Sequence, residues 1–185
     1  DSFTVGDNGL VTAAPGSPFE HQPGVFGQFG SEFSPTNPAQ LFVSNAHNAS
    51  NGPAPGSVSA YTDAADGTLT PIGASPFANA GTASCWIEIS HDGKFLFTVD
   101  TASSTVASYS IGADGTLTAI GNTTIRNSRG AEDARLSPDG STLWVVNGGT
   151  DTISAFSVDG GTLTELAGSP TAGPAGATPS GIVVD

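Results

Sequence analysis

Short apolar runs, many of them alternating with polar residues, recur along the whole chain, and each ends in a turn rich in Gly, Pro, Asp or Asn. The runs KFLFTVD at 94–100 and STLWVVN at 141–147 are typical examples. Alternation with a period of two predicts strands that bury one face, and the frequent turns keep these strands short. The pattern therefore predicts an all-β chain of short antiparallel strands.

One hydrophobic and polar pattern repeats three times along the chain. The copies begin at Ser57, Thr105 and Thr152 and read SVSAYTDAADGTLTPIG, TVASYSIGADGTLTAIG and TISAFSVDGGTLTELAG. The aromatic position of the motif stands at Tyr61, Tyr109 and Phe156, which are 48 and 47 residues apart. A degenerate copy, DSFTVGDNGLVTAAPG, opens the chain. A repeat of this length that contains only strands and turns is the signature of a β-propeller blade.

A second block lies between these copies. It begins at Glu32, Glu88 and Arg135 and reads EFSPTNPAQLFVSN, EISHDGKFLFTVD and RLSPDGSTLWVVN. Each block predicts an apolar strand, a turn and another strand, so one repeat holds four strands, which we name a, b, c and d from the inside outward. The expected fold is an all-β propeller of four-stranded antiparallel blades, with about 3.5–4 blades in this chain.

The repeats divide the chain, a single propeller portion over 1–185, into successive pieces. These are the end of a blade at 1–26, full blades at 27–77, 78–125 and 126–171, and the inner strand of a closing blade at 172–185. A ring of so few blades stays open, and open edges expose unpaired backbone groups. We expect the missing blades to come from an N-terminal segment or a second chain, or the edges to be used in self-assembly.

The SPDG turns followed by a strand, the DGTLT hairpins and the terminal PSGIVV resemble the lactonase-type seven-bladed propellers. That family includes 6-phosphogluconolactonases and carboxymuconate-lactonising cyclases. The resemblance covers the C-terminal portion of such proteins, and it implies a seven-bladed ring and a possible lactone hydrolase or cyclase without a cofactor. Family enzymes commonly carry a His in or just before an inner strand, and no strand a of this chain contains one.

The composition narrows the range of partners. The formal net charge is −13, with only 4 Lys and Arg against 17 Asp and Glu. Such a chain cannot neutralise a row of phosphates, so we expect no nucleic acid, and it is equally unsuited to an anionic membrane surface. The single Cys85 can form no internal disulfide, and no metal motif is present. High Thr, Ser and Gly with few Lys suggest a secreted or extracytoplasmic bacterial protein.

Three of the four cations, Arg126, Arg129 and Arg135, fall within ten positions. In the four-strand scheme the d–a crossings and b–c loops share one face of the disc. Arg126 and Arg129 lie in such a crossing, as does His21, and His47 lies in a b–c loop. We therefore expect the cations to converge on one end of the channel, where they would bind a small anionic molecule.

Aligned inner strands define the candidate catalytic groups. Glu32, Glu88 and Arg135 occupy equivalent positions. Trp86 and Asp133 are also equivalent to each other, two residues earlier on their strands. Because side chains alternate with a period of two, all five should point to the same side. The hypothesis is a negatively charged lactone opened or closed at the channel mouth. Its oxyanion would be bound by Arg135 and Arg129, and Glu88 and Asp133 would transfer protons, with His47 as a further candidate.

The same residues have structural alternatives. Candidate ligand contacts come from Arg126, Arg129, Glu32, Trp86 and His21. However, Glu88 and Arg135 are equally suited to an ordinary ion pair between blades, Trp86 and Cys85 to core packing, and the loop Arg and His residues to solvent. The alternative function is a non-catalytic secreted or surface propeller that binds a ligand or acts as an assembly scaffold.

Overall fold

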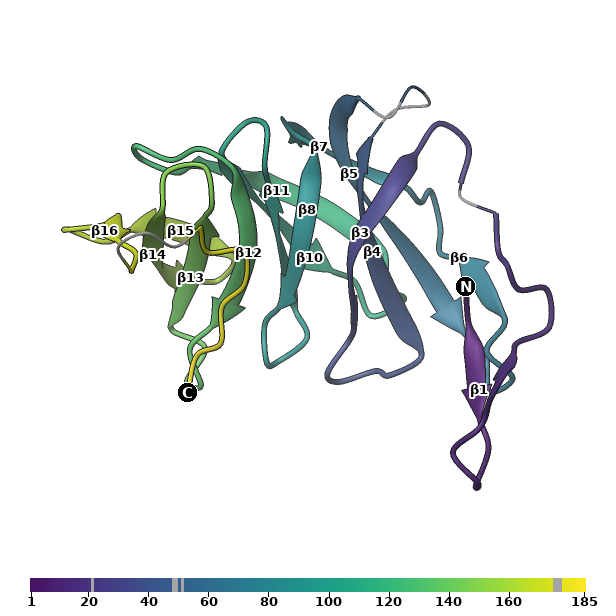
Figure 1. Cartoon of the computed structure of the whole chain (residues 1–185). Helices are drawn as coiled ribbons and strands as arrows, with labels where there is room; N and C mark the ends of the chain where they lie inside the picture. Colours follow the sequence, from purple (N-terminus) through teal and green to yellow (C-terminus); the bar gives the residue numbers. More distant parts are fainter. Residues whose placement is uncertain (21, 48–49, 51, 175–177) are drawn as a thin grey trace.

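Three antiparallel sheets and one separate hairpin stand side by side in a computed structural model of the chain (Figure 1). The structure describes residues 1–20, 22–47, 50, 52–174 and 178–185. These residues form strands and turns, and none of them forms a helix that could cross a membrane. The expected all-β class with propeller blades is confirmed.

The N-terminal half contains the hairpin and the first full blade. The hairpin pairs β1 (Phe3–Val5) with β2 (Val11–Ala13). The first blade consists of β3 (Phe26–Phe33), β4 (Gln40–His47), β5 (Pro53–Asp63), β6 (Leu69–Pro71) and β7 (Phe77–Thr82). The order in this sheet is β3-β4-β5-β6, and β7 also pairs with β5. The outer edge of this blade therefore extends past residue 77.

The other two blades repeat the same order. The second blade is the sheet β8 (Ser84–Ile89), β9 (Phe95–Asp100), β10 (Thr105–Ile111) and β11 (Leu117–Thr124). The third is β12 (Ala131–Leu136), β13 (Thr142–Asn147), β14 (Thr152–Asp159) and β15 (Thr162–Glu165), with β16 (Thr171–Ala172) added on β14. The innermost strands of the three blades are β3, β8 and β12.

Two apolar cores join the blades, because alternate side chains of a strand face opposite neighbours. In β9, Leu96 packs in the core between the first and second blades, whereas Phe97 packs in the core between the second and third. Both side chains are at most 1% exposed. Phe42 of the first blade and Phe156 of the third close the two cores at 0% exposure. The alternation read from the sequence thus fills both interfaces.

A buried polar residue lies at or near the end of the second strand in each of the three blades. Asn45, Asp100 and Asn147 occupy this place, each at most 2% exposed. The two Asn side chains donate to hydroxyls of their own third strands, for example Asn147 to Ser154 at 2.9 Å. In the second blade the carboxyl group of Asp100 replaces the amide. Because a carboxylate only accepts hydrogen bonds, the groups around it must be donors.

Four side chains supply those donors. Asp100 Oδ1 accepts from Ser84 Oγ at 2.6 Å and from Asn79 at 3.3 Å, and Oδ2 accepts from Thr105 Oγ1 at 3.1 Å and from Asn122 at 3.3 Å. Burial nevertheless raises the pKa of Asp100 from 3.8 to about 6, against the hydrogen bonds that lower it. The second blade therefore carries a buried titratable group.

The C-terminal segment departs from expectation. We expected an inner strand at 172–185, but 178–185 forms no strand and runs beside β12 (Figure 1). The backbone N–H of Ile182 donates to Asp133 Oδ2 at 2.8 Å. A strand requires a row of hydrogen bonds from a neighbouring strand. This segment instead meets a carboxylate side chain of β12.

Candidate functional site

The pairing of each inner strand with its neighbour shifts at the same point. The shifts lie between Gln28 and Ser31 in β3, Ser84 and Ile87 in β8, and Ala131 and Asp133 in β12. A bulge of this kind changes the side to which the following side chains point. Strict alternation along the inner strands, which the sequence analysis assumed, therefore does not hold here.

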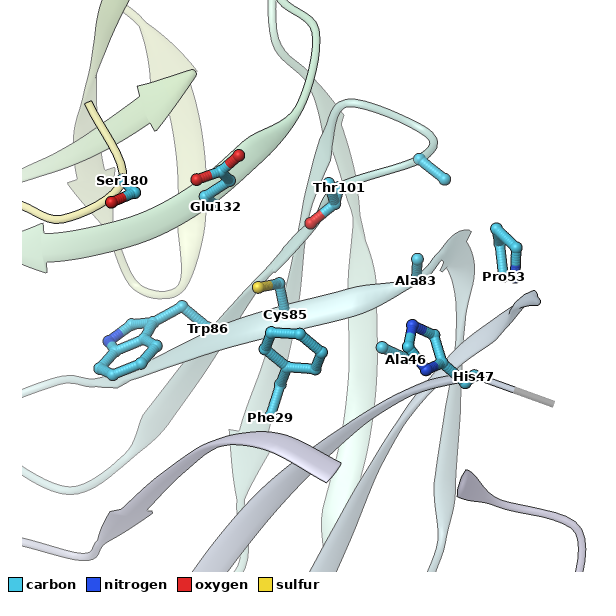
Figure 2. A pocket seen from close by; sticks show the side chains of 11 residues that line it. Phe29, Ala46, His47, Pro53, Ala83, Cys85, Trp86, Thr101, Glu132 and Ser180 are labelled. Atoms are coloured by element: carbon cyan, nitrogen blue, oxygen red, sulfur yellow. The ribbon is translucent and has the colours of Figure 1, made fainter. Parts of the chain in front are cut away.

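A cavity of about 570 Å³ opens beside these bulges. Its walls come from the inner strands through Phe29, Cys85, Trp86 and Glu132, which occupy neighbouring positions of β3, β8 and β12. Figure 2 shows the side chains of these four residues gathered around one space. The rest of the lining consists of Ala46, His47, Pro53, Ala83, Thr101, Ala102 and Ser180. We call this space the inner-strand pocket.

Two of the residues singled out from the sequence, His47 and Trp86, line the inner-strand pocket. The imidazole of His47 packs edge-on against Phe29, with ring centroids 6.0 Å apart and an interplanar angle of 79°. Gly27, at φ +59°, lies beneath His47, and a Cβ there would come within 2.5 Å of His47 Nδ1. The absence of a side chain at residue 27 therefore sets the place of the imidazole.

Cys85 is half-buried in the pocket wall and, like Trp86, also packs against the core between the second and third blades. Burial raises the pKa of the Cys85 thiol, the carboxylates of Glu132 and Asp133 add to that rise, and a hydrogen bond with Thr101 opposes it. The environment of the thiol therefore disfavours the negatively charged thiolate.

Glu88 and Arg135 form the ion pair between blades that the sequence left as an alternative. Arg135 Nη1 donates to Glu88 Oε2 at 3.0 Å, and the backbone N–H of Leu136 donates to Glu88 Oε1 at 2.9 Å. Burial raises the pKa of Glu88, although both contacts lower it. Both carboxylate oxygens are thus engaged in joining β8 to β12.

Glu32 extends this row into the first blade. Burial raises the pKa of Glu32 from 4.5 to about 7, and the nearby Glu88 carboxylate raises it further, whereas Arg135 lowers it. Its Oε2 is buried and has no hydrogen-bond partner among the described residues. A carboxyl group in this state is protonated for much of the time at neutral pH, which relieves its repulsion from Glu88.

Asp133 is 8% exposed and uses both oxygens on backbone groups. It accepts from the N–H of Ala134 at 2.8 Å and from the N–H of Ile182 at 2.8 Å. Its neighbour Glu132, which the sequence analysis did not select, faces the inner-strand pocket instead. The bulge between Ala131 and Asp133 accounts for this exchange.

Two of the three arginines are already paired with carboxylates of this chain. Arg126 Nε donates to Glu165 Oε2 at 2.9 Å and its Nη2 donates to the Leu166 carbonyl at 2.6 Å, on the outer strand of the third blade. Arg129 is exposed. Arg135 lies on β12, where it pairs with Glu88 at 3.0 Å. Arg126 and Arg135 therefore interact with carboxylates from different strands, β15 and β8.

Two predictions remain, the ligand contact from His21 and the absence of a metal motif. His21 lies outside the described residues. Within the part of the chain that the structure describes, no group of three or more His, Cys, Asp or Glu could hold a metal ion. The pocket residues Phe29, Cys85, Glu132, Thr101 and Ser180 were missed. One signal in the sequence could have found three of them. In the aligned inner strands, Phe29, Cys85 and Glu132 occupy equivalent positions, one residue before the equivalent positions of Trp86 and Asp133.

Comparisons with known proteins agree with this architecture. The family model described as "Lactonase, 7-bladed beta-propeller" matches residues 33–179. A Bacteroides uniformis protein provisionally named a 6-phosphogluconolactonase is 22% identical with a TM-score of 0.70, over 88% of this chain and 49% of that one. A Lactobacillus plantarum protein is 25% identical with a TM-score of 0.70, over 89% of this chain and 47% of that protein.

The periplasmic gluconolactonase PpgL of Pseudomonas aeruginosa is 19% identical with a TM-score of 0.66, over 87% of this chain and 45% of that protein. The chain thus spans about half the length of these relatives. A comparison with curated proteins gave no match. Because the family model covers most of the sequence and the blades have the corresponding topology, the chain belongs to the lactonase family of seven-bladed β-propellers.

Proposed function

We propose that the inner-strand pocket binds a lactone and that the protein opens its ring by adding water, or closes it in the reverse direction. Membership of the lactonase family supports this class of reaction. The observation that carries it is the pocket itself, which brings an imidazole from His47 and a carboxylate from Glu132 to a cavity beside the inner strands.

His47 is the proposed general base. In hydrolysis a water oxygen adds to the carbonyl carbon, the bond from that carbon to the ring oxygen breaks, and the ring oxygen leaves as a hydroxyl group. Neutral imidazole can take the proton of the attacking water and return it to the ring oxygen. Glu132, in the same pocket, can stabilise the imidazolium that forms between these two steps.

The finer expectation was a negatively charged lactone held by arginines at the channel mouth. Its motivation was the group of Arg126, Arg129 and Arg135, of which two are bound to Glu165 and Glu88. None of the three is among the lining residues of the inner-strand pocket. The lining of the pocket, and not these arginines, therefore determines which ligand charge the pocket accepts.

Replacing His47 by asparagine is expected to lower kcat/KM for lactone opening by about a hundredfold or more, the usual contribution of a general base. Ring opening can be followed as acid release with a pH indicator on a panel of lactones. His91→Asn is the matched control, because His91 lies at an a–b turn away from the pocket and its loss should leave the rate unchanged.

Full activity in folded His47→Asn protein would exclude the proposed base. Absence of turnover by the unaltered protein on the whole panel would contradict the proposed function and favour the non-catalytic propeller.

A separate proposal concerns the open N-terminal edge. The hairpin exposes the apolar side chains of Phe3, Val5, Leu10 and Val11, which are 53–70% accessible. Exposed apolar groups on a hairpin edge favour association. We propose that this surface packs against another propeller blade, and that in the isolated chain a second copy supplies it.

The native mass of the purified chain should then exceed 18.3 kDa. The double variant Val5→Ser, Val11→Ser should lower that mass toward the single-chain value, whereas Ile120→Ser, at an exposed apolar position of β11, should not. A native mass of one chain at high protein concentration would refute this proposal.

A further inference from the structure

The charge of the inner-strand pocket is the starting point. Among its described lining residues, Glu132 is acidic, and no Lys or Arg is present to balance it. The cation on β12 is Arg135, which is paired with Glu88 at 3.0 Å, and the exposed Arg129, three residues before Glu132, is not among the described lining residues. An anion bound beside Glu132 would therefore lose hydration and meet a like charge, and among the described lining residues His47 alone could supply a positive charge.

Cys85 lies in the same pocket wall as Glu132. Burial is the largest cause of the raised pKa of the Cys85 thiol, and the carboxylates of Glu132 and Asp133 add to the rise because negative charges oppose the formation of a thiolate. The same field acts on any negative group that a ligand places near Cys85. The described lining of the pocket thus contains one carboxylate and no Lys or Arg, and the Asp133 carboxylate lies close enough to act on Cys85 as well.

The shape and apolar lining favour a ring. Phe29 and Trp86 extend into the space from adjacent inner strands, with Cys85 between them (Figure 2). Pro53 and three alanines provide half of the remaining eight lining residues, and His47, Thr101, Glu132 and Ser180 provide the other half. Aromatic side chains bind the flat faces of rings by stacking and by apolar contact. A volume of about 570 Å³ accommodates a ligand of one or two rings.

We propose that the inner-strand pocket selects uncharged, apolar-faced lactones, which lie against Trp86 and Phe29, over lactones that carry a carboxylate or phosphate group. That the ligand is a lactone rests on the proposed function. The preference for an uncharged ring rests on the lining of the pocket alone. It reverses the ligand charge that the arginine-rich segment had suggested.

The only thiol of the chain allows a direct test of the charge preference. Cys85 is treated with neutral 4,4′-dithiodipyridine and with dianionic 5,5′-dithiobis(2-nitrobenzoate), and each rate is divided by that for a free small thiol. We expect the normalised rate of the dianionic reagent to be lower by about tenfold at low salt. Glu132→Gln, which keeps the shape and removes the charge, should reduce that gap by about threefold.

Equal normalised rates for the two reagents, or a gap that Glu132→Gln leaves unchanged, would overturn the proposed field. Lack of reaction with either reagent would show that Cys85 does not line an open pocket and would overturn the inference as well. Cys85→Ser is the control for reaction elsewhere.

The ligand preference is tested by protection of Cys85 from 4,4′-dithiodipyridine. The probes are a matched pair, the uncharged aromatic lactone dihydrocoumarin and its ring-carboxylated analogue. We expect dihydrocoumarin to slow labelling in a saturable manner, and the carboxylated analogue to require a concentration at least about tenfold higher. Trp86→Ala should weaken protection by dihydrocoumarin, with folding checked by circular dichroism.

Equal protection by the two lactones, or protection by neither, would overturn the inference. Protection by dihydrocoumarin without hydrolysis would leave the inference standing and would contradict only the proposed function. The two failures are therefore distinguishable.

Discussion

Asp100→Asn is expected to raise the free energy of unfolding at pH 8 by about 2 kcal/mol and to leave it nearly unchanged at pH 4. The folded state raises the pKa of Asp100 from 3.8 to about 6 and so favours the protonated form. The stability that this group contributes is present below about pH 4 and is lost as the pH rises through 6. A rise of about two pKa units corresponds to about 3 kcal/mol, of which the amide forfeits about 1 kcal/mol through a lost acceptor.

The measurement is urea unfolding, followed by tryptophan fluorescence, of both proteins between pH 4 and pH 8. The difference between the two curves isolates Asp100, since Glu32 and the surface carboxylates titrate in both proteins. Asn147→Asp is the reciprocal variant, because it places a carboxyl group at the equivalent position of the third blade, and it should introduce a similar loss of stability at high pH. A difference that does not vary with pH would contradict the assignment.

Glu88→Ala is expected to lower the free energy of unfolding by about 3 kcal/mol. The substitution leaves the buried N–H of Leu136 without its acceptor and Arg135 without its partner. The Glu88 side chain is 7% exposed, whereas that of Arg135 is 41% exposed, so solvent compensates Arg135 more than Leu136. Most of the loss should therefore come from the unsatisfied N–H group.

Two further variants separate these contributions in the same unfolding experiment. Arg135→Ala should cost about 1 kcal/mol, since it removes a partly exposed ion pair and keeps the hydrogen bond from Leu136. Glu88→Gln keeps an acceptor for Leu136 and should fall between the two alanine variants. If Arg135→Ala were the more destabilising alanine variant, the principal role of Glu88 would be the ion pair and not the backbone contact.

The architecture could be predicted because it depends on local patterns. The period of two places Leu96 and Phe97 on opposite sides of one strand, and both sides of a blade are buried. The repeated DGTLT hairpins and SPDG turns mark where each strand reverses. Each of these features depends on only a few neighbouring residues, and each recurs from repeat to repeat. The blade and its strand order therefore follow directly from the sequence.

The candidate site was harder to predict because it depends on exceptions to the pattern. Alternation counted from Glu88 and Trp86 assigned Asp133 to the site, whereas the bulge in β12 turns Glu132 into the pocket. Close spacing assigned three arginines to one place, whereas Arg126 pairs with Glu165, which lies 39 residues further along the chain. Neither a bulge nor a long-range partner leaves a mark in the local pattern.

The sequence by itself determined the all-β class, the four-stranded blades and their family, because repeating turns and alternating side chains dictate these locally. Only the tertiary structure decided which inner-strand residues share a cavity, which carboxylates are already bound and where the positive charge is neutralised. Those features depend on how strands from different repeats face one another, and hence on distances that no spacing along the chain specifies.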